Sequence, residues 1–251
     1  MTNDFDFSLY CGECLSVLPE IASASVDMIF TDLPYGTTKH AWDKHIDFNA
    51  LWKEYERIIK DNGVIALWAQ SPFDKVLACS NLKLYRYEWI IEKTSATGFL
   101  NAHKMPMKAH ENILIFYKRL PTYNPQITHG HTRKVATAYH KRRSPKYTGY
   151  GDYGLIDYDS TDRFPRDVLR FKWDKQKSAL CPTQKPVAAC EYMIRTYTNP
   201  GDVVLDSCMG SGTTGVAALS LGRKFIGIEI DLEMFDKADR RISSHYGNPQ
   251  D

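Results

Sequence analysis

The 251-residue sequence predicts an α/β fold with a doubly wound, mostly parallel sheet. Short apolar runs rich in β-forming residues recur along the chain. Several are apolar on both faces, as strands covered by helices on each side are. Segments with helical spacing separate these runs, which gives the alternation of strand and helix typical of doubly wound sheets. A glycine-rich turn also joins one strand to a helix, as in α/β proteins that bind a ligand at the edge of the sheet.

Seven runs and three intervening segments define the expected elements. The first helix is expected to begin behind Asp47 as N-cap, to bury apolar residues from Phe48 to Ile59, and to close at the Asp-Asn-Gly turn at 61–63. A second begins at Pro186 and ends at the Asn-Pro-Gly-Asp turn at 199–202, and a third spans 216–221. The predicted strands are 7–10, 26–31, 64–69, 87–91, 113–117, 203–205 and 225–230.

Composition excludes several classes of protein. With 43% hydrophobic and 25% charged residues, the chain has the usage of a soluble globular protein, not of a disordered, collagenous or membrane chain. No apolar run approaches the roughly 18 residues of a membrane span. The N-terminal MTNDFDF is acidic and lacks the pattern of a signal peptide, so we expect a cytoplasmic protein with reduced cysteines.

Positive charge is concentrated in one stretch. The forty residues between Glu111 and Asp152 contain no acid, eight Lys or Arg residues, several tyrosines and many turn formers. Such a segment cannot form a core. It is typical of a basic loop region that follows a phosphate backbone and offers rings to bases, although a solvated surface insertion has the same composition.

The glycine-rich turn is the first candidate binding site. It follows the strand that ends at Asp206, and the next strand ends at Glu229, where an acid can accept both hydroxyls of a ribose. Its three glycines, Gly210, Gly212 and Gly215, fit the G-x-G-x-x-G spacing of dinucleotide enzymes. Against an oxidoreductase, only 20 residues follow Asp231, and Asp206 would repel a pyrophosphate but attract a cationic ligand.

A second candidate site follows the strand at 26–31. Here Asp32, Leu33, Pro34 and Tyr35 offer a carboxylate, a free carbonyl and an aromatic ring at the carboxyl end of a strand. Together these groups can hold an exocyclic amine while the ring stacks on a base. A plain strand-ending turn is the alternative for the tetrapeptide taken alone.

These motifs together resemble those of the beta-group DNA amino-methyltransferases, which use S-adenosylmethionine. D-L-P-Y at 32–35 resembles the catalytic D-P-P-Y motif of the family, with Leu33 in place of a proline. Residues 206–213 resemble its cofactor loop, and C-P-T-Q-K-P at 181–186 resembles its H-P-T-Q-K-P motif. The catalytic motif precedes the cofactor motifs, which is the circularly permuted order of the beta group. The whole pattern is most similar to orphan DNA methylases of phages and prophages.

The resemblance implies a Rossmann-like, seven-stranded methyltransferase sheet formed by residues 1–118 and 178–251, with an inserted basic target-recognition region at 119–177. The implied cofactor is S-adenosylmethionine, and the implied partner is double-stranded DNA. The resemblance implies no metal and leaves open whether the protein forms a homodimer. The implied catalytic residues are Asp32, Pro34 and Tyr35. The implied cofactor-binding residues are Glu13, Asp32, Thr183, Lys185, Asp206, Ser207, Gly210, Ser211, Gly212, Thr213 and Glu229. The residues expected to contact DNA are Arg133, Lys134, Lys141, Arg142, Arg143 and Lys146.

The implied reaction is methylation of the exocyclic N6 of an adenine rotated out of the duplex. Asp32 and the Pro34 carbonyl are expected to accept hydrogen bonds from N6, while Tyr35 stacks on the base. Methylation of cytosine N4, an RNA substrate, and a catalytically inactive DNA-binding protein of the same fold are the alternatives. Cys11 and Cys14 have metal-ligand spacing, but no second pair completes a zinc site, so no metal is expected.

Overall fold

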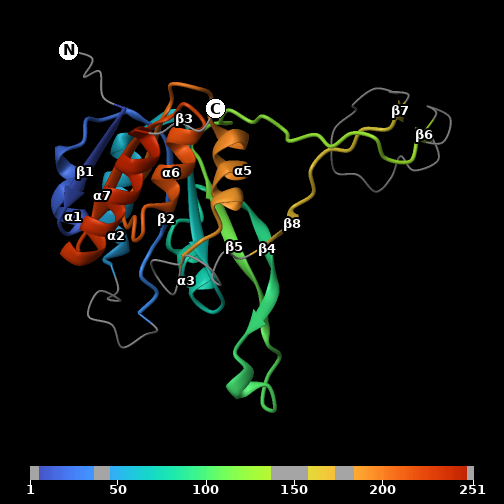
Figure 1. Cartoon of the computed structure of the whole chain (residues 1–251), viewed down its shortest axis with the longest axis horizontal. Helices are drawn as coiled ribbons and strands as arrows, with labels where there is room; N and C mark the ends of the chain where they lie inside the picture. Colours follow the sequence, from blue (N-terminus) through green and yellow to red (C-terminus); the bar gives the residue numbers. More distant parts are fainter. Residues whose placement is uncertain (1–5, 37–45, 137–157, 173–183, 248–251) are drawn as a thin grey trace. The chain divides into compact units, whose positions relative to one another are not determined.

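The computed structural model describes residues 6–36, 46–136, 158–172 and 184–247 (Figure 1). The chain divides into two compact units, residues 1–124 with 167–251 and residues 125–166. The larger unit contains both motifs that carry chemistry and is described first.

The larger unit is built on an eight-stranded sheet with the strand order β1-β10-β9-β2-β3-β5-β4-β8. Only β5 runs antiparallel to its neighbours, so the mostly parallel α/β fold is confirmed. All seven predicted strands are in the sheet, and the eighth, β8, was not predicted. In chain order the strands are β1 (Phe7–Cys11), β2 (Val26–Asp32), β3 (Ile59–Ala69), β4 (Tyr85–Thr97), β5 (Lys108–Phe116), β8 (Val168–Phe171), β9 (Val203–Asp206) and β10 (Lys224–Glu229).

Helices cover both faces of the sheet. One core cluster contains residues of α1 (Cys14–Val17), α2 (Phe48–Ile58) and α3 (Phe73–Ser80). The other contains residues of α5 (Val187–Tyr197), α6 (Thr213–Ser220) and α7 (Leu232–Gly247). Successive residues of β3 alternate between the clusters, since Leu67 packs in the first and Trp68 in the second. Both faces of a central strand are therefore apolar, which explains its nearly continuous hydrophobic run. The described part of this unit also contains two 3-10 turns, η1 (Leu18–Glu20) and η2 (Phe99–Asn101).

Several predicted boundaries shift. Asp47 does cap α2, because its side chain accepts a hydrogen bond from the Asn49 amide at 2.9 Å. The turn predicted at 61–63 is wrong, since α2 ends at Ile58 and β3 begins at Ile59. The strand passes so close to β2 that a Cβ at Gly63 would lie 2.8 Å from the Asp27 carbonyl oxygen. A glycine that reads locally as a turn former is thus required here for strand packing.

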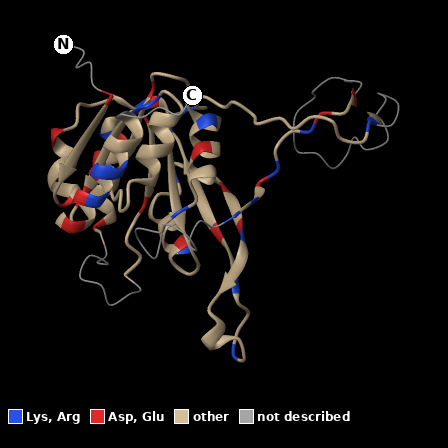
Figure 2. Cartoon of the chain, viewed as in Figure 1, with Lys and Arg blue, Asp and Glu red and all other residues tan. Residues whose placement is uncertain are grey.

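The carboxyl ends of the parallel strands meet at one edge of the sheet. Asp32 ends β2, Asp206 ends β9 and Glu229 ends β10. Because β5 is antiparallel, its first residues lie at this same edge. Beyond the edge, β4 and β5 continue as a two-stranded hairpin (Figure 1). Its far end carries lysine but no acidic residue (Figure 2).

The smaller unit contains a short antiparallel pair, β6 (Lys134–Ala136) and β7 (Tyr158–Ser160). An isolated antiparallel bridge joins Thr128, which precedes β6, to Arg163, which follows β7. The predicted target-recognition region at 119–177 is wider than this unit, because its residues 168–171 form β8 at the edge of the large sheet. In the described part of the chain, no helix is long and apolar enough to cross a membrane.

Candidate active site

The D-L-P-Y segment leaves the sheet at the end of β2. Thr31 and Leu33 are buried, while Asp32 is partly exposed, so the alternation of the strand presents the carboxylate at the edge. Tyr35 donates a hydrogen bond from its hydroxyl to Asp32 Oδ1 at 2.6 Å, and its ring stacks on Phe73 with centroids 4.7 Å apart. Leu33, which stands where the family motif has proline, is a core residue with 2% exposure.

Four charged side chains form a continuous line at this edge, which we call the charge chain: Asp32, Lys185, Glu111 and Lys93. Lys185 Nζ lies 2.6 Å from Asp32 Oδ2 and 3.0 Å from Glu111 Oε2, and Lys93 Nζ lies 2.6 Å from Glu111 Oε1. The side chains of Lys93, Glu111 and Lys185 are at most 12% exposed. The residues come from the end of β2, the segment before α5, the start of β5 and β4.

Burial and neighbouring charges have opposite effects on the pKa values in the charge chain. Burial alone would lower the pKa of Lys185, but the charges of Asp32 and Glu111 outweigh it, so its pKa lies above the ordinary value. Burial would raise the pKa of Glu111, but Lys185 and Lys93 more than compensate and leave it below the ordinary value. The arrangement therefore keeps Lys185 positively charged and Glu111 negatively charged.

Sequence reasoning had assigned Lys185 to the cofactor alone, and the structure adds its contact with Asp32. Lys93 was given no role, and Glu111 was expected to have only a capping or surface role, whereas its side chain is 12% exposed and paired with two lysines. Both are charged residues two positions from an apolar run, Ile90-Ile91 before Lys93 and Ile113-Leu114 after Glu111, and that is the signal that could have found them.

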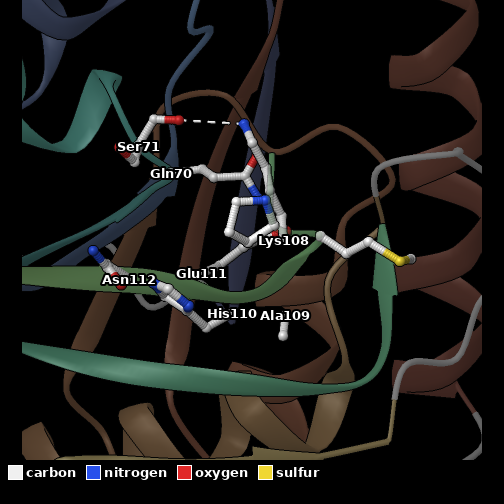
Figure 3. Close-up of a pocket in the computed structure, with 9 residues that line it drawn as sticks. Gln70, Ser71, Lys108, Ala109, His110, Glu111 and Asn112 are labelled. Atoms are coloured by element: carbon white, nitrogen blue, oxygen red, sulfur yellow. Dashed lines mark hydrogen bonds between the residues drawn. The ribbon is translucent and has the colours of Figure 1, made fainter. Parts of the chain in front are cut away.

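A cavity of about 240 Å³ adjoins the charge chain, and Glu111 is part of its lining (Figure 3). Lys108 spans it by donating to Gln70 Oε1 at 3.2 Å and to the Ser71 carbonyl at 3.3 Å. The cavity is lined by the residues that follow β3 and those that begin β5: Gln70, Ser71, Pro106, Met107, Lys108, Ala109, His110, Glu111 and Asn112. It therefore lies at the carboxyl edge of the sheet, where ligands of open α/β sheets bind.

The second motif forms what we call the glycine cradle, residues 206–213 together with Glu229. Asp206 is buried, and its carboxylate is held by neutral donors, namely the Cys208 amide at 3.1 Å and the hydroxyls of Thr214 and Thr31. Burial raises its pKa to about 6 despite these hydrogen bonds. A buried carboxylate with neutral partners suits a ligand that brings a positive charge.

The two glycines of the cradle differ in their surroundings. Gly210 and Gly212 both have positive φ, of 49° and 72°. A Cβ at Gly210 would have no atom within 4 Å, whereas a Cβ at Gly212 would lie 2.9 Å from the side chain of Ile242. Gly210 thus faces open space where a ligand can approach, and Gly212 allows α7 to pack closely.

Ser211 and Thr213 are held from behind by Arg241 of α7. Arg241 donates to the Ser211 carbonyl at 2.9 Å, to the Ser211 hydroxyl at 3.3 Å and to the Thr213 hydroxyl at 3.0 Å. Ser207 contacts the Tyr55 hydroxyl at 2.6 Å within the buried region below. Sequence reasoning missed Arg241, because nothing in the helical pattern of α7 distinguishes it from its neighbours.

Glu229 faces the same loop from β10. It accepts hydrogen bonds from the Gly210 amide at 2.8 Å and the Asp231 amide at 2.9 Å, and burial raises its pKa. Its carbonyl accepts a hydrogen bond from the Gly12 amide at 2.8 Å, which brings Gly12 and Glu13 to this edge. Glu13 also caps α1 by accepting from the Ser16 amide at 2.9 Å.

Two of the residues expected to contact DNA are in the smaller unit. Arg133 is in the smaller unit, where its Nε donates to Asp159 Oδ1 at 2.6 Å, and Lys134 begins β6. Thr183, Lys141, Arg142, Arg143 and Lys146 lie outside the described residues. Within the described ranges, no group of three or more His, Cys, Asp or Glu side chains is arranged to hold a metal ion.

Comparison with known proteins gives consistent relatives. The chain is 30% identical to the DNA adenine methyltransferase YhdJ of Escherichia coli (strain K12), over 94% of this chain and 83% of that protein. It is 27% identical to the Type II methyltransferase M2.MboI of Moraxella bovis, over 96% and 89% of the two chains.

Solved structures agree on the architecture. The M1.HpyAVI-SAM complex superposes with a TM-score of 0.61 at 25% identity, over 94% of this chain and 99% of that one. The PvuII DNA methyltransferase (cytosine-N4-specific) superposes with a TM-score of 0.68 at 15% identity, over 96% and 92%, and shows the fold alone. A family model described as DNA methylase matches residues 26–240, and the chain belongs to this family.

Proposed function

We propose that this chain is an S-adenosylmethionine-dependent enzyme that methylates the exocyclic N6 of adenine in double-stranded DNA. The observation that carries the proposal is the position of Asp32, which lies at the carboxyl edge with both oxygens held, one by Tyr35 and the other by Lys185. The relative named a DNA adenine methyltransferase, similar over nearly the whole chain, supports the choice of base.

The glycine cradle fits S-adenosylmethionine. Asp206 is a buried carboxylate with neutral donors, so the ammonium or sulfonium charge of this cofactor would compensate it. Gly210 leaves room for close approach, and Glu229 has further lone pairs for ribose hydroxyls. When bound, the cofactor supplies an electrophilic methyl group. The solved relative in complex with SAM supports the same assignment.

The residues at the end of β2 would act on the adenine. Asp32 and the Pro34 carbonyl accept hydrogen bonds from the two N6 protons and thereby orient the nitrogen lone pair towards the methyl group. Tyr35 and Lys185 hold the Asp32 carboxylate in one orientation, which removes the cost of ordering it during the reaction. The methyl carbon would pass from the sulfonium sulfur, which would leave as a neutral thioether, to N6, and the proton that N6 loses would go to Asp32 or to solvent.

The adenine must leave the duplex to reach Asp32, at a cost of a few kcal/mol in lost stacking and pairing. The cavity beside Glu111 lies at the same edge and is the opening through which we propose that the base enters. Residues 119–177 would then contact the DNA, and a cytoplasmic location is part of the same proposal. Lys134 is one of the described cations to test there, since Lys134→Ala should reduce the salt dependence of DNA binding by about one unit of slope.

Product analysis tests the proposal. The protein and its Asp32→Ala variant are incubated with methyl-labelled S-adenosylmethionine and unmethylated duplex DNA, and the nucleosides are identified by mass spectrometry. We expect labelled N6-methyladenine from the wild type and at least about 100-fold less of it from Asp32→Ala in the same time. Label in N4-methylcytosine would overturn the choice of base. The absence of label from a folded protein that binds DNA would overturn the enzyme in favour of a DNA-binding protein.

A further inference from the structure

Glu111 and Lys93 are two and three contacts away from Asp32, on strands that neither motif includes. Glu111 is near the start of β5, and Lys93 is on β4. Glu111 pairs in register with Ile91, which is two residues before Lys93 on β4. Both side chains are nearly buried, at 12% and 6% exposure. Burying a charged side chain costs free energy unless the charge is paired, so the presence of two charges at this position needs an explanation.

The reason lies in how Lys185 is shared. A lysine that touched Asp32 alone would form a tight pair with it and neutralise the carboxylate that must accept the N6 protons. In the structure, Lys185 lies between two carboxylates, 2.6 Å from Asp32 and 3.0 Å from Glu111. Its positive charge is therefore divided between them. The other oxygen of Glu111 is in turn held by Lys93 at 2.6 Å, so each oxygen of this carboxylate has its own lysine.

The two positive and two negative charges of the charge chain sum to zero, so these four side chains bring no net charge to the carboxyl edge of the sheet. Lys185 is further placed by the ring of Trp68, whose centroid lies 5.3 Å from Nζ. Asp206 of the cradle and Cys190 of α5 also interact electrostatically with Asp32. None of these replaces Glu111 as the second carboxylate on Lys185.

We propose that Glu111 and Lys93 are positioning residues for methyl transfer, which hold Lys185 so that it orients Asp32 without neutralising it. The proposal rests on the function proposed above. It does not assign either residue a contact with the base or the cofactor.

The test is a set of variants that changes charge at nearly constant shape, measured as single-turnover methyl transfer per cofactor-binding site. Glu111→Gln should slow methyl transfer by about 10- to 100-fold, the loss expected when a reacting group is misplaced. The dissociation constant for S-adenosylmethionine should stay within about twofold, because the cradle is untouched. Counting only molecules that bind the cofactor removes any loss due to unfolding.

Charge-conserving variants separate positioning from packing. Lys93→Met should slow the reaction, and Lys93→Arg should recover most of the rate because it restores the charge on Glu111. If Lys93 acts through Glu111, then adding Lys93→Met to Glu111→Gln should slow the reaction by no more than about twofold further. Glu92→Gln, a neighbouring carboxylate on β4, is the matched control and should keep the wild-type rate.

Failure of this inference differs from failure of the proposed function. A wild type that transfers no methyl group refutes the function itself. A wild type that is active, with Glu111→Gln equally active per binding site, refutes the positioning role alone. Equal losses in cofactor affinity and in rate would also refute it, because they would indicate a general distortion of the site.

Discussion

The glycine cradle and the charge chain lie at the same edge of one sheet but are built in opposite ways. Apart from Glu229, the cradle is one continuous loop. Its shape is set by hydrogen bonds from backbone amides to the carboxylates of Asp206 and Glu229 and by the positive φ of Gly210 and Gly212. The charge chain is assembled from side chains of four separate segments and is held by alternating charges. The difference indicates separate tasks. The cradle offers a ligand its backbone groups and open space, whereas the charge chain holds the carboxylate of Asp32 in place.

Substitution of Asp32 should separate the two regions most strongly. Asp32→Ala removes the group that orients N6 and should slow methyl transfer by about 10²- to 10³-fold, the range for losing one preorganised electrostatic contact. Although Asp32 is also among the residues expected to contact the cofactor, cofactor affinity, measured by isothermal titration calorimetry, should fall much less than the rate. Asp61→Ala, which removes an exposed carboxylate early in β3, is the control. A loss of cofactor binding in Asp32→Ala as large as the loss of rate would contradict the separation.

Asp206 should show the reverse pattern, with a pH dependence of its own. Asp206→Asn should weaken S-adenosylmethionine by about 10- to 100-fold, since a hydrogen bond to a charged group contributes about 1.5–3 kcal/mol. Burial raises the pKa of Asp206 to about 6, so the carboxylate becomes neutral as pH falls through that value. Wild-type affinity should therefore drop below pH 6, by up to about tenfold per pH unit.

The sign for folding is opposite to the sign for binding. Because the folded pKa is above the unfolded one, the folded chain binds this proton more tightly, and Asp206 favours the folded state increasingly as pH falls from about 6 towards 4. Affinity should be flat across pH 5 to 7 in Asp206→Asn. A wild-type affinity that is equally flat would show that this carboxylate does not meet the cofactor charge.

The two cradle glycines provide a sharper comparison within one loop. Gly212→Ala combines a left-handed backbone with a clash against Ile242 and should destabilise the fold by about 2–4 kcal/mol. Gly210→Ala meets no neighbour and should cost only about 1–2 kcal/mol, yet it should weaken cofactor binding because its methyl group enters the open space. Thermal denaturation and titration of both proteins check this. Equal destabilisation by the two changes would contradict the distinction between a ligand-facing and a packing glycine.

Arg241 should have the smallest effect. Arg241→Met removes donors to Ser211 and Thr213 and should raise the dissociation constant of the cofactor less than about tenfold, with a stability loss of about 1–2 kcal/mol. Arg240→Met, on the exposed neighbouring position of α7, is the control and should match the wild type. If both variants bind alike, the cradle does not depend on support from α7.

The same contrast explains what could be predicted from the sequence. The cradle was predictable because Asp206, Gly210 and Gly212 are close in sequence and their requirements are local. The charge chain was not, because Lys93 and Glu111 acquire a meaning only when β4 and β5 pair beside Lys185. The turn at 61–63 failed for a related reason, since Gly63 serves contact with β2 and not chain reversal. Likewise β8 has only four residues, which are exposed or half-buried, so the sequence shows no apolar run there. It is recognised as a strand only by its pairing with β4.

The most direct measurement is a cycle of Asp206→Asn, Glu111→Gln and the double variant, with cofactor affinity and single-turnover rate determined for each protein. Separate tasks predict that Asp206→Asn changes affinity, that Glu111→Gln changes rate, and that the double variant shows both losses multiplied independently. A Glu111→Gln protein that loses cofactor affinity as much as rate, or a double variant no worse than either single one, would contradict this account.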